Sequence, residues 1–261
     1  MKVLHVWDLA GVANIIAKFM DRLYGTESYV MSRKVFDEFG WNIYTTPMND
    51  GATMFVIKAL LKARKYDIIH VHWLDKIVPF LKILYHKPVV IGYYGTSTRS
   101  TWKVRRKKWS RADLILYSTQ DLVTDETPKE AKWFPCPIDT DLFYPRPHIN
   151  RGTAVTFEYE ANDLVNQYAR NYGLALTISK RNVPYLKMAD FLSQYEFYID
   201  VKRWRGKVTE ALSKTGLEAL ACGCKVIRWD GQIMRELAPE HRAENAVMKL
   251  YEIYQSLLKK G

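Results

Sequence analysis

The segment TEALSKTGLEALACG, residues 209–223, carries side chains whose types and spacing could bind an anion. Ser213 suits the N-cap of a helix, because its hydroxyl can accept hydrogen bonds from N–H groups of the first turn. Gly223 suits the end of the same helix, where a left-handed conformation is common. Lys214 then falls in the first turn, where the helix dipole disfavours a cation by roughly 0.3–1 kcal/mol. A bound anion reverses that sign, because the N–H groups and the lysine together form a phosphate site.

Two glutamates flank the start of this helix. Glu218 lies about one turn inside it, where a carboxylate can accept hydrogen bonds from two neighbouring hydroxyls, and Glu210 precedes the helix on a loop. A phosphate at the helix start and a diol one turn away match the layout of a nucleoside diphosphate sugar. The alternative from these residues alone is that Lys214 is a solvated surface charge and Glu218 an acid on the helix face.

The elements that must position these residues follow an alternating pattern. Short apolar runs rich in β-branched residues alternate with helical patterns, which predicts a parallel sheet covered on both faces. The strands expected in the first half of the chain are 2–8, 67–73, 88–95 and 113–119, and the helices are near 55–64, 76–85 and 100–110.

A proline-rich stretch divides the chain. Residues 134–152, FPCPIDTDLFYPRPHINRG, lack helical periodicity and predict a linker. Beyond it the alternation resumes on a smaller scale, so we expect a first domain over 1–141 and a second over 151–233. Ligands of such sheets lie beyond the carboxyl ends of the strands, which favours a site in a cleft between the domains.

The bulk composition limits the class of protein. The 261 residues are 48% hydrophobic and 26% charged, as in a soluble globular protein, and no apolar run has the length of a membrane span or a leader, so we expect a cytoplasmic location. The net charge of +11 attracts nucleic acid, nucleotide phosphates or an anionic membrane without choosing among them. Three cysteines, Cys136, Cys222 and Cys224, are too few for a disulfide framework, have no metal-ligand partners nearby, and are expected to be buried thiols.

A second cluster of charge lies at 99–111, RSTWKVRRKKWSR. Cations mixed with Trp102 and Trp109 on one helix suit an anionic membrane surface or a phospholipid-linked acceptor. The same mixture could bind nucleic acid, although no nucleic-acid motif is recognisable, and a solvated helix is the third option.

Six segments, in order along the chain, resemble the retaining glycosyltransferases of the GT-B fold, the family often called glycosyltransferase group 1 or family 4. The segments are Asp8–Ala13, Asp67–Trp73 (DIIHVHW), Val89–Thr96, Ala112–Thr119 (ADLILYST), Pro135–Phe143 (PCPIDTDLF) and Glu210–Ile227. The resemblance implies an α/β protein with two Rossmann-like parallel-sheet domains facing a cleft. The chain ends in an amphipathic segment that predicts a helix over 234–260, with helical spacing of Ala246, Leu250, Ile253, Tyr254 and Leu257. The resemblance implies that this helix crosses back onto the first domain.

The resemblance further implies a retaining, metal-independent transfer of a sugar from a nucleoside diphosphate sugar to an acceptor, with a lipid- or phosphate-linked acceptor favoured by the charge. The leaving diphosphate would help to deprotonate the acceptor on the same face. No cofactor or metal is expected beyond the donor. The expected catalytic residues are Glu210, Lys214 and Arg205; the donor-binding residues are Gly11, Val12, Ser213, Thr215, Glu218 and Lys207; the acceptor-side residues are Tyr94, Gly95 and Arg99.

The sequence departs from the family pattern in two places that bear on activity. Tyr94 stands where the family has a histidine. The second domain is shortened and lacks the Gly-Arg and Lys-Gly strand that supplies two cations to the donor phosphates. Arg205 and Lys207 could replace them, because Gly206 gives the backbone freedom there and both lead into Glu210. A GT-B-like binding protein without catalysis therefore stays open as an alternative, followed by a basic nucleic-acid-binding protein.

Overall fold

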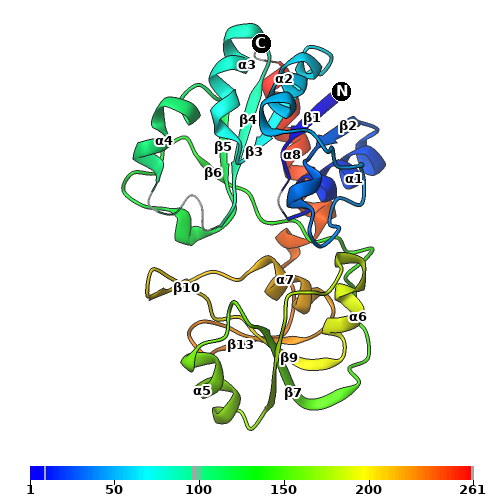
Figure 1. Cartoon of the computed structure of the whole chain (residues 1–261), viewed down its shortest axis with the longest axis vertical. Coiled ribbons are helices and arrows are strands. Elements are labelled where there is room, and N and C mark those ends of the chain that lie inside the picture. Colours follow the sequence, from blue (N-terminus) through cyan, green and yellow to red (C-terminus); the bar gives the residue numbers. More distant parts are fainter. Residues whose placement is uncertain (9, 96–98, 100, 260–261) are drawn as a thin grey trace. The chain divides into compact units, whose positions relative to one another are not determined.

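The computed structural model describes residues 1–8, 10–95, 99 and 101–259. Leu9, Thr96, Ser100 and Lys260, which belong to segments singled out above, lie outside the described residues. The chain divides into two compact units (Figure 1): Met1–Pro137 together with Ala243–Gly261 forms unit 1, and Ile138–Arg242 forms unit 2. No helix in the described part of the chain is long and apolar enough to cross a membrane.

Unit 1 is built on a parallel sheet with the strand order β2-β1-β3-β4-β5-β6. Its strands are β1 (Lys2–Val6), β2 (Glu27–Met31), β3 (Ile68–His72), β4 (Val89–Tyr93), β5 (Leu114–Tyr117) and β6 (Lys132–Trp133). The four strands expected from the apolar runs are confirmed, and β3 and β4 are buried along their whole length. β2 and β6 were not predicted from the sequence, because neither is a continuous apolar run: β2 has polar residues at one end, and β6 has only two residues.

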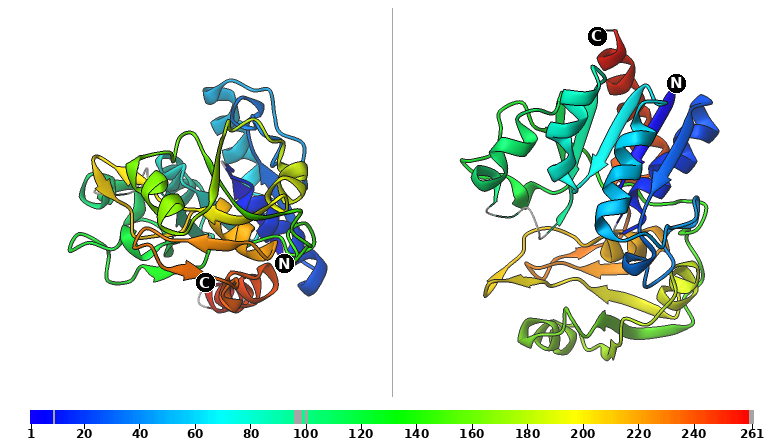
Figure 2. Two further views of the ribbon diagram at one scale, coloured as in Figure 1. Left: turned by 90° about the horizontal axis from the view of Figure 1, so that it is seen from below. Right: turned by 45° about the horizontal axis from the view of Figure 1, so that its top comes forward.

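Helices cover this sheet and include one from the far end of the chain. They are α1 (Val12–Tyr24), α2 (Ala52–Ala63), α3 (Val78–Leu84), α4 (Trp102–Trp109) and α8 (Ala243–Leu258), with 3-10 turns at Lys34–Phe36, Asp75–Ile77 and Gln120–Leu122. α8, red in Figure 2, runs beside α1, where Tyr24 and Tyr251 stack with ring centroids 4.2 Å apart.

Unit 2 has a smaller sheet with the order β13-β12-β9-β7-β8, parallel except for the edge strand β13. Its strands are β7 (Asn150–Phe157), β8 (Ala175–Ser179), β9 (Tyr195–Ile199), β12 (Lys225–Ile227) and β13 (Ile233–Met234), with a hairpin of β10 (Arg203–Trp204) and β11 (Lys207–Val208). Its helices are α5 (Asp163–Asn171), α6 (Met188–Leu192) and α7 (Lys214–Ala221), with 3-10 turns at Tyr185–Lys187 and Pro239–His241.

The C-terminal helix is shorter than the sequence pattern indicated. The expected segment began at 234, but Met234 lies in β13 and the helix begins at Ala243, after the 3-10 turn that contains Pro239. Proline lacks the N–H that a helix interior requires, which explains the later start. The expected apolar spacing is confirmed within α8, where Ala246, Leu250 and Tyr254 are fully buried.

The tryptophans of the basic segment do not face outward, and the expectation that Trp102 and Trp109 would meet a membrane is wrong. Trp102 is fully buried and donates from its indole to the Leu122 carbonyl at 2.7 Å. Trp109 is 8% exposed and donates to the Trp102 carbonyl at 2.8 Å. The two tryptophans are seven residues apart and therefore lie on one face of α4, and this face packs into the core of unit 1.

Candidate functional site

The start of α7 has the geometry that the sequence predicted. Ser213 is the N-cap, and its hydroxyl accepts from the Gly216 N–H at 2.9 Å. Gly223 follows the helix end with φ of 86°, in the left-handed region. Helix geometry leaves the first four N–H groups without intrahelical partners, so this end is the electropositive one.

Lys214 and Glu218 form a pair on one face of α7. The Lys214 ammonium contacts Glu218 Oε1 and donates to the Tyr185 hydroxyl at 3.0 Å. The side chains are only 16% and 4% exposed, so the alternative of a solvated lysine and an acid on the helix surface is wrong. Burial raises the pKa of Tyr185, which keeps its hydroxyl protonated.

Asp200 lies against the same helix start and was not found from the sequence. It follows β9, and its Oδ2 accepts from the Ser213 N–H at 2.6 Å. A Cβ at Gly216 would collide with Asp200 Oδ2, so only glycine fits there. Burial, together with the Glu160 carboxylate nearby, raises the pKa of Asp200 to about 7. The signal available in the sequence was its place directly after a buried strand.

Glu160 is a second buried acid at this edge of the sheet, just after β7. Tyr198 donates its hydroxyl to Glu160 Oε2 at 2.6 Å, and the Lys202 ammonium lies 2.8 Å from Oε1. Lys202 therefore partly offsets the negative charge of these two neighbouring acids, while burial is the main reason why the pKa of Asp200 is raised.

Tyr159 extends this edge towards β8. The residue is 46% exposed, and its partial burial raises the pKa of its hydroxyl. The Arg181 guanidinium lies 5.0 Å from the ring centroid and the Lys202 ammonium 5.7 Å, both within the range of cation–π attraction. Arg181 is therefore one cation that unit 2 brings to the carboxyl edge of its sheet.

The remaining residues expected around the donor in unit 2 are exposed. Arg205 (φ 49°) and Gly206 (φ 80°) form the turn of the β10–β11 hairpin, which confirms the backbone freedom expected of Gly206. Apart from the backbone pairing of the hairpin, the side chains of Arg205, Lys207 and Glu210 make no hydrogen bond or ion pair with another described residue. The structure thus groups Ser213, Lys214, Thr215 and Glu218 but not these three.

In unit 1, Gly11 and Val12 lie at the start of α1. Gly11 has φ of 76°, and a Cβ there would lie 3.3 Å from the Trp41 carbonyl oxygen. Asp8 caps this helix by accepting from the Asn14 N–H at 3.0 Å and from its side-chain amide at 2.8 Å. The backbone at Gly11 therefore lies close to Trp41, and the Asp8 carboxylate holds the first turn of α1.

The residues expected on the acceptor side are internal or paired. The Tyr94 hydroxyl is buried without a partner among the described residues, and burial raises its pKa. Its ring stacks on His72, with centroids 5.7 Å apart. Gly95 follows with φ of 66°, and the Arg99 guanidinium is paired with the Asp121 carboxylate.

Searches of solved structures show what this architecture resembles. HepE of Anabaena, in a complex with UDP, matches 99% of this chain and 92% of its own, with a TM-score of 0.53 at 12% identity. The UDP-GlcNAc 2-epimerase of Neisseria meningitidis, bound to UDP-GlcNAc, matches 100% of this chain and 93% of its own, with a TM-score of 0.51 at 13% identity. The fold is GT-B. No protein-family model and no curated protein matches the sequence. At these identities the likeness is one of fold.

Proposed function

We propose that this GT-B protein is a glycosyltransferase that uses a nucleoside diphosphate sugar. The observation that carries the proposal is the start of α7, where Lys214 lies in the first turn and a buried carboxylate, Glu218, lies one turn further in. Two proteins of similar fold were crystallised with UDP or UDP-GlcNAc, which supports a uridine nucleotide as the first donor to test.

Different groups at this edge of the sheet bind different parts of the donor. The N–H groups at the start of α7 and Lys214 hold the diphosphate, with the Thr215 hydroxyl beside them. Glu218 accepts from the ribose hydroxyls. Glu210 and Arg205, both exposed, approach the transferred sugar and the phosphates when the donor is bound.

Transfer then proceeds with retention and without a metal at the donor. The departing diphosphate oxygen takes the acceptor proton on the same face of the sugar, and Lys214 with the N–H groups at the start of α7 stabilises the charge that develops. Gly11 and Val12 supply backbone N–H groups, and Tyr94, Gly95 and Arg99 belong to the acceptor side, with Arg99 released from Asp121 when it acts.

The affinity for the donor should depend on whether Asp200 is protonated. A diphosphate at the Ser213 end of α7 would repel an ionised Asp200, so the donor should bind the form in which Asp200 is protonated. Since the pKa of Asp200 is raised to about 7, affinity for the diphosphate should fall as the pH rises above that value.

The test is calorimetric titration with UDP, other nucleoside diphosphates and their sugars at pH 6.5 and 8. We expect tighter binding at pH 6.5, proton uptake measured by comparing buffers of different ionisation enthalpy, and at least a tenfold loss in Glu218→Gln. Glu130→Gln, which removes an exposed carboxylate from unit 1, is the matched control and should bind normally. Absence of binding to every nucleotide, or full binding by Glu218→Gln, would contradict the proposal.

An anionic, lipid-linked acceptor is the finer part of the proposal, with contact to the membrane surface through 99–111. The support is that α4 exposes Lys103, Arg106 and Lys107, with Val104 79% exposed among them. In a flotation experiment, the protein should float together with vesicles that contain anionic lipid but not with neutral vesicles. A variant in which Lys103, Arg106 and Lys107 are all replaced by glutamine should not float with the anionic vesicles. Equal retention by neutral vesicles would exclude this contact.

A binding protein without transferase activity is the second candidate. The specific observation behind it is Asp200, whose carboxylate occupies one side of the helix start that a diphosphate would use. Nucleotide binding with hydrolysis and transfer at background rates, over a panel of acceptors that includes lipid phosphates, would favour this candidate over the transferase.

A further inference from the structure

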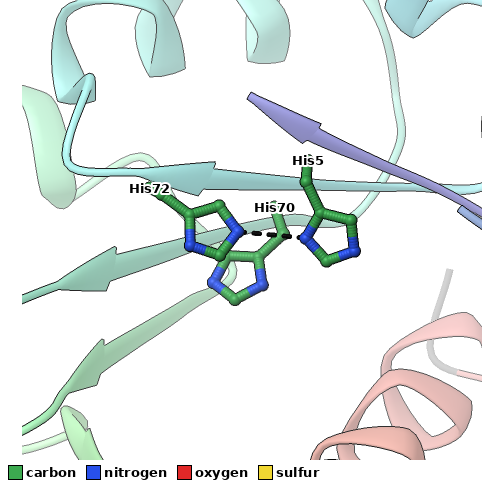
Figure 3. Close-up of side chains that lie close together, drawn as sticks. All are labelled: His5, His70 and His72. Atoms are coloured by element: carbon green, nitrogen blue, oxygen red, sulfur yellow. Dashed lines mark hydrogen bonds between the residues drawn. The ribbon is translucent and has the colours of Figure 1, made fainter. Parts of the chain in front are cut away.

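Three histidines meet on one face of the sheet in unit 1. His5 on β1 lies directly opposite His70 on β3, and His72 lies two residues further along β3, so the three side chains share a face. Figure 3 shows the rings turned towards one another. Each residue offers a ring nitrogen within 4.8 Å of those of the other two, and all three are buried.

Their hydrogen bonding is incomplete. His5 Nδ1 and His72 Nε2 lie 3.0 Å apart, so one proton is shared between them (Figure 3), and His70 Nδ1 lies 2.7 Å from the Tyr254 hydroxyl of α8. The other ring nitrogens, His5 Nε2, His70 Nε2 and His72 Nδ1, are buried without a partner among the described residues. A buried polar atom without a partner costs about 1–3 kcal/mol, so three in one cluster require an explanation.

The rings are held in the form that binds metal ions. All three rings are buried, and burial favours the neutral imidazole over the charged form. A neutral imidazole has one lone pair in its plane, and it is the commonest metal ligand in proteins.

We propose that His5, His70 and His72 bind one zinc ion inside unit 1. Zinc–imidazole bonds of about 2.0–2.1 Å place tetrahedral ligands about 3.3 Å apart, so rings already within 4.8 Å need only small rotations. Three imidazoles suit Zn²⁺, Cu²⁺ or Ni²⁺, whereas Mg²⁺ and Ca²⁺ prefer oxygen ligands. The sequence led us to expect no metal, and this proposal departs from that expectation. The proposed site lies in unit 1, whereas the start of α7 belongs to unit 2.

Two tyrosines complete the surroundings. The Tyr254 hydroxyl at His70 Nδ1 orients that ring and leaves Nε2 for the metal, which is the usual arrangement around a ligating histidine. Tyr94 stacks on His72, and its unpartnered hydroxyl is a polar group available to the fourth position or to a water there. Gly92 makes room for it, because a Cβ at that position would lie 2.5 Å from the Tyr94 hydroxyl.

The role that follows is structural. The ion would join β1 to β3 directly and would hold α8 to them through Tyr254, so zinc should raise the stability of unit 1. A buried structural site contributes binding energy to folding, and this contribution is lost when a chelator removes the ion.

The test is metal content and stability of the full chain. The protein is stripped with a chelator under denaturing conditions, refolded with or without Zn²⁺, separated from free metal by gel filtration and measured by elemental mass spectrometry. We expect one zinc per chain, a higher melting temperature with zinc, and visible d–d absorption typical of a tetrahedral site when Co²⁺ replaces it. Refolded protein that retains no stoichiometric zinc and gives no such Co²⁺ spectrum would overturn the proposal.

Substitutions locate the site. His72→Asn, which keeps a polar side chain of similar size, should lose the zinc and the stability that it confers, whereas His86→Asn, at an exposed histidine of the same unit, should keep both. Tyr254→Phe should retain zinc with weaker affinity. Full zinc content in a folded His72→Asn variant would contradict the site, as would its loss from His86→Asn. If His72→Asn fails to fold, the Co²⁺ spectrum and zinc content of the unsubstituted protein decide.

Discussion

The starts of α1 and α7 use the same device with different completeness. At α1, Asp8 accepts from the Ala10 N–H at 3.2 Å and from the backbone and side-chain amides of Asn14 at 3.0 and 2.8 Å. At α7, Asp200 accepts from Ser213, but its Oδ1 is buried without a partner. Both oxygens of the Asp8 carboxylate accept hydrogen bonds at the start of α1. One oxygen of the Asp200 carboxylate has no partner among the described residues, and the negative charge of Glu160 lies nearby. The comparison separates an acid that is held fully by its helix start from one whose protonation, in the proposed function, would respond to a ligand.

The largest loss of stability should come from removing Lys214, the cation in the first turn of α7, which has no counterpart in the first turn of α1. Lys214→Met leaves the buried Glu218 carboxylate without its partner, which should lower the free energy of unfolding by about 3 kcal/mol. Lys225→Met, whose ammonium pairs with the more exposed Glu196, is the matched control and should cost less than about 1 kcal/mol. Chemical denaturation measures both, and equal costs would mean that burial of the first pair does not matter.

The close approach of Asp200 to α7 gives the next largest effect. Gly216→Ala should lower the free energy of unfolding by about 1–3 kcal/mol, because the new Cβ collides with the Asp200 carboxylate. Gly51→Ala tests the same change at the N-cap of α2, where φ is −64° and no atom lies within 4 Å of the new Cβ, and it should be nearly neutral. A neutral Gly216→Ala would show that Asp200 moves away freely.

The satisfied acid at α1 should be stabilising. Asp8→Asn replaces charge-assisted hydrogen bonds to Asn14 by weaker ones and puts an amide where a carboxylate oxygen accepted, so we expect a loss of about 2 kcal/mol at pH 7. Thermal unfolding of the variant beside the unsubstituted protein measures this loss. An unchanged melting temperature would break the contrast between the two helix starts.

Substitution of Asp200 beside α7 should change the free energy of unfolding in the opposite direction, and by the smallest amount. The folded-state pKa of Asp200, about 7, lies above the ordinary value of 3.8, so the folded state binds the proton more tightly than the unfolded state. Its stabilising contribution is therefore full below about pH 4 and is lost as the pH rises through about 7. Asp200→Asn should raise the free energy of unfolding by about 1 kcal/mol at pH 8 and flatten its dependence on pH between 5 and 8. Denaturation at several pH values would contradict this if the variant were less stable at pH 8.

The helix that carries the candidate site could be predicted from the sequence, since its limits depend on local chemistry. Ser213 caps its own helix and Gly223 ends it, and neither needs a distant partner. The four buried strands of unit 1 were equally accessible, because runs of β-branched residues between turns are a local signal.

What could not be predicted depends on register and packing. Asp200 reaches α7 only because β9 ends beside that helix, and its partner Ser213 lies thirteen positions further along the chain. His5 faces His70 only through the pairing of β1 with β3, although the alternation of His70 and His72 along one strand was visible. The inward orientation of Trp102 and Trp109 was missed for the same reason, since amphipathic character in so short a helix does not say which side is covered.

Because α8 belongs to unit 1 although it follows all of unit 2, the order of synthesis matters. A ribosome delivers β1 and β3 well before α8, so the histidine face of the nascent sheet lacks its contact with Tyr254 until α8 has been synthesised. During that interval unit 2 can already form its core. Unit 1, whose strands are synthesised first, is therefore completed after unit 2.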